Sequence, residues 1–239
     1  QFSDLELFKK LSPEKSTFKP VLKIVVLSLA FACLVIALVN PKMGTKMETV
    51  KRQGIDIVFA VDISKSMLAE DIAPNRLEKT KQLVSQIINE LGNDRVGIVG
   101  YAGSAYPVLP MTTDYGIAKM YLQSMNTDMV SSQGTAINDA LKLSVDYFDI
   151  KDTSKLIILV SDGEDHGVGA DEAIAMAKDK NVRIFSIGMG TEKGAMIPIK
   201  DNRGNIISYK KDQNGDNVIT KMYPETLKSI SDKTKAKYI

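Results

Sequence analysis

Cysteine, histidine and tryptophan are nearly absent from this 239-residue sequence, which contains one Cys, one His and no Trp. The single cysteine, Cys33, excludes an internal disulfide bond and a cysteine-based zinc site. The single histidine, His166, excludes a histidine-rich metal cluster. Neither a disulfide framework nor a Cys- or His-based metal site is therefore expected.

A strong excess of charge of one sign is also absent, because 31 Lys and Arg residues stand against 29 Asp and Glu residues. This balance of +2 does not indicate a nucleic-acid-binding chain. With 44% hydrophobic residues the chain can bury a core, which excludes disorder as its main state. Residues 1–53 hold nine basic and four acidic residues, whereas residues 54–239 hold 22 and 25. The two parts are therefore expected to lie in different surroundings.

One long apolar run is present, from Val21 to Val39, and its only charged residue is Lys23. A helix of these nineteen residues is roughly 28 Å long, which matches a bilayer core. A cleavable signal peptide is less favoured, because the run is long and no A-x-A site follows it. We therefore expect a juxtamembrane segment (1–20), a transmembrane helix (21–40) and a linker (41–53).

The basic residues that flank this helix do not predict which of its ends faces the cytoplasm, because four lie before it and four after it. They are Lys9, Lys10, Lys15 and Lys19 before the helix, and Lys42, Lys46, Lys51 and Arg52 after it. The first residue is Gln rather than Met, so a further segment is expected upstream.

After residue 53, apolar stretches with the character of buried strands alternate with stretches of helical periodicity. The expected strands are 55–64, 95–101, 105–109, 155–163 and 182–187. The expected helices are 76–91, 115–125, 136–148 and 171–180. Pro107 lies within the strand at 105–109 and Pro110 follows it, which suits the edge of a sheet. This order predicts an α/β domain over 54–239, a doubly wound and mostly parallel sheet with helices on both faces.

Turn signals interrupt the pattern between Met196 and Met222, where Asn202-Arg203-Gly204 and Asn214-Gly215 are typical of hairpins. We expect a small β-hairpin insertion there (196–222), followed by a helix that begins at Pro224 and a short strand near Tyr238. The acidic stretch 212–216 is only faintly like a calcium loop. Tyr223 stands where that loop needs its glutamate, so a turn is favoured.

Oxygen-bearing side chains follow the carboxyl ends of two expected strands, where α/β folds bind ligands. Asp62, Ser64 and Ser66 follow the first strand, and Asp162 follows the strand at 155–163. Thr135 lies in a loop before a helix. Taken singly, either aspartate is better explained as a turn or helix-cap residue. Together, the five residues predict a site of hard oxygen ligands suited to Mg²⁺ or Mn²⁺.

The pattern D-x-S-x-S at Asp62, a Gly-Thr loop at Thr135 and S-D-G around Asp162 resemble the metal-ion-dependent adhesion site (MIDAS) of von Willebrand factor A (VWA) domains. The resemblance implies a Rossmann-like VWA fold over 54–239. It also implies that Ser64, Ser66 and Thr135 coordinate the ion directly or through water. Asp62 and Asp162 would then act largely through bound water and hydroxyl groups, and a coordination position would remain for a partner's carboxylate.

The surrounding sequence, including NPKMGTKMETVKRQGIDIVFAVDISKSM and DRVGIVGYAGSAYPVLPMTTDYGIAKMYL, is similar to the Bat (aerotolerance) family of bacterial membrane proteins, and most similar to its BatB group. That resemblance implies an inner-membrane protein whose VWA domain faces the periplasm. It also implies protein partners, namely other Bat-type VWA proteins and a MoxR-type AAA+ ATPase, in a complex linked to stress or oxygen tolerance. A second membrane helix beyond residue 239 is a further expectation.

Two classes of function remain open: a metal-dependent protein-interaction module and a Mg²⁺-dependent hydrolase or phosphotransferase that uses Asp62. The sequence has no phosphate-binding G-x-x-x-x-G-K-[ST] loop and no second aspartate two residues after Asp62. It also lacks a nucleophile-elbow pattern. The interaction module is favoured, without a catalytic residue or a small-molecule substrate.

Overall fold

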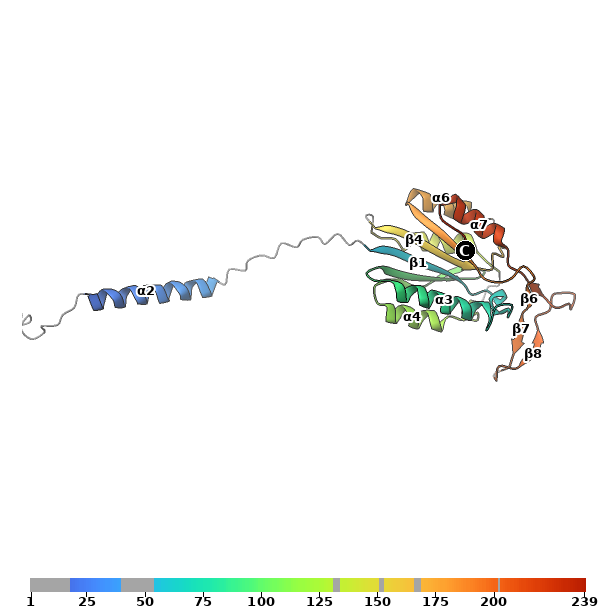
Figure 1. Cartoon of the computed structure of the whole chain (residues 1–239), viewed down its shortest axis with the longest axis horizontal. Helices are drawn as coiled ribbons and strands as arrows, with labels where there is room; N and C mark the ends of the chain where they lie inside the picture. Colours follow the sequence, from blue (N-terminus) through green and yellow to red (C-terminus); the bar gives the residue numbers. More distant parts are fainter. Residues whose placement is uncertain (1–17, 40–53, 131–133, 151–152, 166–168, 202) are drawn as a thin grey trace, which may run out of the picture. The chain divides into compact units, whose positions relative to one another are not determined.

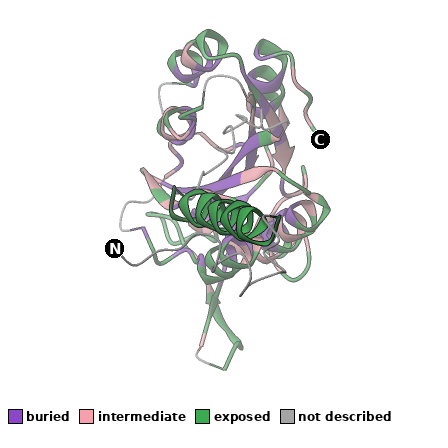
Figure 2. Ribbon diagram, turned by 90° about the vertical axis from the view of Figure 1, so that its left-hand side faces the viewer, coloured by how far each residue is buried: buried purple, intermediate pink, exposed green. Residues whose placement is uncertain are grey.

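The apolar N-terminal segment forms one long helix. The computed structural model describes residues 18–39 and 54–239 except 131–133, 151–152, 166–168 and 202, and the chain divides into an N-terminal unit and a larger C-terminal unit. Helix α2 (Phe18–Val39) has 22 residues, all exposed, as Figure 2 shows. At 1.5 Å per residue it is about 33 Å long, enough to cross a bilayer core. The expected linker at 41–53 and most of segment 1–20 lie outside the described residues.

A five-stranded sheet forms the centre of the C-terminal unit (Figure 1). Its strands are β1 (Ile55–Asp62), β2 (Arg95–Tyr101), β3 (Ala105–Thr112), β4 (Ser154–Ser161) and β5 (Val182–Gly188), in the order β3-β2-β1-β4-β5. All neighbours pair in parallel except β3, which is antiparallel to β2 at the edge. The predicted mostly parallel sheet and its proline-containing edge strand are therefore confirmed. Near Tyr238, a single bridge to Ser186 of β5 takes the place of a longer strand.

Helices cover both faces of the sheet, and β1 shows why. Ile57, Phe59 and Val61 pack in one buried cluster, whereas Val58 and Ala60 pack in another, because successive residues of a strand point to opposite faces. The first cluster includes side chains of α3 (Arg76–Glu90) and α4 (Tyr115–Ser124). The second includes α5 (Ile137–Asp146), α6 (Asp171–Asp179) and α7 (Pro224–Lys233). The doubly wound arrangement is thus confirmed.

The expected β-hairpin insertion is present as two small antiparallel pairs. Strand β6 (Ala195–Met196) pairs with β9 (Ile219–Thr220), and β7 (Pro198–Lys200) pairs with β8 (Ile206–Tyr209). The carboxylate of Asp212 accepts hydrogen bonds from the backbone N–H groups of Asn214 and Asp216 at 2.8 and 3.0 Å, as in a turn. In Figure 1 these strands lie beyond the carboxyl ends of β1 and β4.

Candidate metal centre

The end of β1 brings two hydroxyl groups together. The backbone N–H of Ser64 donates to Oδ1 of Asp62 at 2.9 Å, which folds the chain back directly after the strand. The 3-10 turn η1 (Lys65–Leu68) follows, and the Oγ atoms of Ser64 and Ser66 lie 2.8 Å apart. The D-x-S-x-S pattern therefore forms one compact loop in which the two serine hydroxyls meet.

The end of β4 joins this loop through Ser161. Its Oγ donates to Oδ2 of Asp62 at 2.7 Å, so both carboxylate oxygens of Asp62 accept hydrogen bonds. Asp62 and the adjacent Asp162 are fully buried. Burial, and then the negative charge of Asp162, raise the pKa of Asp62 well above its usual range. A cation bound nearby would favour the ionised form of Asp62.

Three of the predicted site residues border one small cavity of about 110 Å³. They are Ser64, Ser66 and Thr135. Asp62 and Asp162 do not border it and are buried in the same carboxyl edge of the sheet. On the opposite wall, the β-insertion contributes Ile197, Lys210 and Thr220 among others. Residues 131–133, which precede Thr135 in its loop, and His166 lie outside the described residues.

The donor set suits a hard divalent cation. Hydroxyl and carboxylate oxygens are the ligands that Mg²⁺ and Mn²⁺ prefer. Among the described residues, no group of three His, Cys, Asp or Glu side chains is arranged to hold a metal ion. An ion in this cavity would therefore rely on hydroxyl groups and water in addition to the two aspartates and Glu164, which also borders the cavity.

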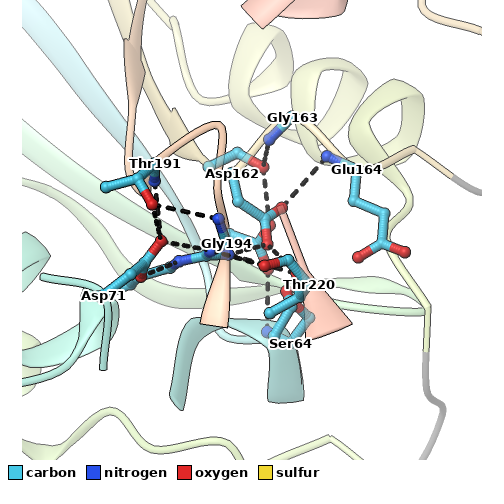
Figure 3. Close-up of polar contacts among 12 residues, drawn as sticks. Ser64, Asp71, Asp162, Gly163, Glu164, Thr191, Gly194 and Thr220 are labelled. Atoms are coloured by element: carbon cyan, nitrogen blue, oxygen red, sulfur yellow. Dashed lines mark hydrogen bonds and ion pairs between the residues drawn. The ribbon is translucent and has the colours of Figure 1, made fainter. Parts of the chain in front are cut away.

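Arg76, which belongs to no predicted motif, donates a hydrogen bond to Asp162 of the site. Figure 3 labels Asp71, Asp162 and Thr220, the three residues that the Arg76 guanidinium contacts. Arg76 is the first residue of α3 and is fully buried. Its Nη1 donates to Oδ2 of Asp162 at 3.0 Å, and its Nε and Nη2 donate to the two oxygens of Asp71 at 2.8 Å each. One guanidinium therefore bridges two carboxylates, one of which belongs to the predicted metal site.

The same guanidinium connects the site to the β-insertion. Nη2 of Arg76 donates to the carbonyl oxygen of Thr220 at 3.1 Å, and Asp71 accepts from both the N–H and the hydroxyl of Thr191 at 2.8 and 3.0 Å. Burial by itself raises the pKa of Asp71, but the hydrogen bonds from Arg76 and Thr191 outweigh it and lower the pKa to about 2. Asp71 therefore remains ionised and holds Arg76 in place. The insertion is thus fastened to the metal-site edge of the sheet.

A comparison with known families agrees with this fold. Residues 56–232 match the von Willebrand factor type A domain. The match covers more than half of the chain, and the chain belongs to this family.

Two solved structures show which members of the family this chain is similar to. BatB from Bacteroides thetaiotaomicron is 38% identical with a TM-score of 0.73, over 78% of this chain and 89% of that one. An aerotolerance-related membrane protein from Bacteroides fragilis is 34% identical with a TM-score of 0.73, over 78% of this chain and 90% of that one. The predicted resemblance to Bat proteins is therefore confirmed.

A curated relative from Borreliella burgdorferi, described as uncharacterized, is 31% identical over 182 residues. The match covers 74% of this chain and 53% of the relative, so the chain spans about half the length of that relative.

Proposed function

We propose that this protein is a membrane-anchored VWA interaction module that binds one divalent cation, Mg²⁺ or Mn²⁺, and captures a protein partner through it. Ser64, Ser66 and Thr135 coordinate the ion directly or through water, whereas Asp62 and Asp162 act mainly through water and hydrogen-bonded hydroxyl groups. The convergence of three hydroxyl side chains on one cavity, with two buried aspartates at the same edge, carries this proposal.

The charge balance of the site favours an acidic partner. Asp162 already accepts a hydrogen bond from the buried Arg76, so its charge is partly offset before any metal binds. A divalent ion held mainly by neutral hydroxyls keeps positive charge, which attracts a carboxylate most strongly where water is excluded. A partner's acidic side chain is therefore the expected occupant of the open coordination position.

Catalysis through Asp62 is less well supported than binding. Both of its carboxylate oxygens accept hydrogen bonds, from the Ser64 N–H and the Ser161 hydroxyl, and its side chain does not border the cavity. A nucleophile must reach the reacting atom of its substrate. This geometry supports a structural role for Asp62 beside the metal.

The proposed setting is the bacterial inner membrane, with helix α2 as anchor and the VWA domain on the periplasmic side. Likeness to the Bacteroides membrane protein and the apolar helix support it. The proposed partners are other Bat-type VWA proteins, with a MoxR-type AAA+ ATPase as a further member of the complex and a role in stress or oxygen tolerance. Direct contact between this domain and that ATPase would require exposure to the cytoplasm.

Metal binding is tested by calorimetry on the full chain in detergent. We expect one weakly bound Mg²⁺ or Mn²⁺, and Ser64→Ala/Ser66→Ala should weaken it by about tenfold or more, the usual effect of disturbing a metal site. The matched control is Ser154→Ala/Ser229→Ala, which changes two exposed serines on β4 and α7 away from the cavity. Equal metal binding by wild type and Ser64→Ala/Ser66→Ala would contradict the proposal.

Partner capture is tested by affinity purification of the full-length membrane protein with magnesium or with chelator. Partners should co-purify in magnesium and be lost in chelator. Thr135→Ala should lose them too, while its unfolding free energy in chelator stays within about 1 kcal/mol of wild type. If neither chelator nor Thr135→Ala reduces partner capture, the metal site has a structural role and the proposal is contradicted.

A further inference from the structure

We call the small cavity bordered by Ser64, Ser66 and Thr135 the metal cavity. A second, larger cavity of about 520 Å³ opens beside it. Lys65, Ile197 and Lys210 border both cavities, so the two form one continuous surface. One wall of the larger cavity comes from η1 and the start of α3, and the other comes from β7 of the insertion. We call this larger cavity the insertion groove. Its volume lies in the range that small ligands and short peptide segments occupy.

Both walls of the insertion groove contribute apolar side chains among its polar ones. Leu77, Ile197 and Pro198 are buried, Leu68 is half-buried, and Ile199 is 44% exposed at the border. An apolar side chain placed here would contact groups from both walls and lose its own exposure to water, which is favourable.

Unpaired positive charge lies where the groove meets the metal cavity. Of the four lysines that border the groove, Lys81 pairs with Glu78 at 2.7 Å and Lys200 pairs with Glu70. Within the part of the chain that the structure describes, Lys65 and Lys210 have no acidic partner. The third acidic side chain of the groove, Asp128, is exposed. Glu164 borders the smaller cavity as well, so two lysines stand against one carboxylate where the two cavities meet. The junction therefore keeps an excess of positive charge, which, in addition to the metal, attracts a further negative group.

We propose that the insertion groove binds an extended acidic segment of a partner protein. One carboxylate of this segment completes the metal coordination, a neighbouring carboxylate lies between Lys65 and Lys210, and an apolar side chain fills the groove. The inference rests on the proposed function, because the first carboxylate needs the metal. Long lysine side chains can bring both ammonium groups to one carboxylate while their stems cover apolar surface. Charge complementarity of this kind favours the correct partner and speeds its association.

The test measures fluorescence anisotropy of labelled peptides with the full chain in detergent and Mg²⁺. The probe is Gly-Leu-Gly-Asp-Glu-Gly-Leu-Gly, which offers a leucine on either side of an acidic pair. Two comparison peptides replace both leucines by asparagine, or the glutamate by glutamine. Burying a leucine contributes enough that the asparagine peptide should bind about tenfold more weakly. The glutamine peptide should bind more weakly by a similar factor, because it leaves the two lysines without their carboxylate.

Two variants of the protein test whether these differences in peptide affinity arise in the insertion groove. Lys65→Glu/Lys210→Glu should weaken binding of the probe by more than tenfold, and Ile199→Asn should remove the advantage of the leucines. The matched control, Lys178→Glu/Lys237→Glu, changes two lysines that border neither cavity and should bind as wild type.

Equal binding of the three peptides, no measurable binding of the probe, or full binding by Lys65→Glu/Lys210→Glu would overturn the inference. Failure of the proposed function looks different: chelator and Ser64→Ala/Ser66→Ala would then leave peptide binding unchanged. If the three peptides bind with equal affinity and their binding requires magnesium, the inference about the groove is wrong and the proposed metal-dependent function stands.

Discussion

Arg76 supplies a permanent positive charge beside the proposed metal position. Its guanidinium is fully buried and contacts Asp71, Asp162 and Thr220, three residues that are far apart in the sequence. Because the guanidinium already offsets part of the charge of Asp162, the proposed divalent ion should be bound more weakly than by two free carboxylates. A weakly held, incompletely neutralised ion is the form that best accepts a further carboxylate from outside.

Replacement of Arg76 by leucine should therefore have two measurable effects. Two buried carboxylates, Asp71 and Asp162, would lose their partner, so the free energy of unfolding should fall by about 3–5 kcal/mol. Mg²⁺ should recover more of this loss in Arg76→Leu than it adds to wild type, because the ion then faces an unneutralised Asp162. Thermal unfolding with magnesium or chelator measures both effects. The control, Arg183→Leu, removes an exposed arginine of β5, and a loss in Arg76→Leu as small as in this control would contradict the prediction.

The residues of the metal site divide into those that sequence can identify and those that it cannot. Asp62, Ser64 and Ser66 were predictable because a short pattern at the end of an apolar strand places them together. Asp71 and Thr191 were not, because their hydrogen bond joins residues 120 positions apart and depends on how the insertion folds back. Arg76 gave one local signal: it is a cation in the first turn of a helix, where the helix dipole disfavours positive charge.

At the scale of elements, the hydrophobic pattern of the sequence predicted the strands of the sheet and the helices that cover it. It predicted the insertion only in outline. The alternation in β1 and the periodicity of α3 repeat over many residues, so each fixes an element and its buried face. The two-residue strands β6 and β9 have no such repeat. They pair across an intervening hairpin, so their partners depend on tertiary packing rather than on local sequence.

The approach of the β4–α6 loop to the start of α7 depends on Gly163. Its φ of +80° is in the left-handed region, and a Cβ there would overlap the carbonyl oxygen of Tyr223. The N–H of Tyr223 donates to the carbonyl oxygen of Asp162 at 2.7 Å, so the two segments are in direct backbone contact. Gly163→Ala should therefore lower the free energy of unfolding by more than about 2 kcal/mol, because strain and overlap add.

Gly204→Ala is the matched control for this substitution. Gly204 has nearly the same φ, +84°, but open space around its Cβ position. It should lose only about 1 kcal/mol, the cost of the backbone conformation alone. Denaturant unfolding of both variants measures the difference, and equal losses would show that the close approach to Tyr223 adds nothing.

At the scale of the whole molecule, the proposed binding surface of the VWA domain lies at the opposite end of β1 from Gly54, the first described residue of the domain. The described domain begins at Gly54, and β1 then runs through eight residues, about 26 Å, from Ile55 to Asp62. The metal cavity, the insertion groove and the insertion lie at the far end of that strand. Partner capture, as proposed, would therefore take place at the opposite end of β1 from Gly54.

The side of the membrane that this surface faces determines which partners it can contact. The reactivity of a cysteine placed at position 211 measures which side that is. Lys211 is exposed in the β-insertion, and Cys33, the one native cysteine, is replaced by alanine to remove background. Because the proposed placement is periplasmic, Lys211→Cys should react with an impermeant maleimide in intact cells whose outer barrier has been opened. The opposite control is Lys9→Cys, which precedes the apolar helix and should react only after inner-membrane lysis. The reverse pattern would put the metal cavity in the cytoplasm, where the domain could contact a MoxR-type ATPase directly.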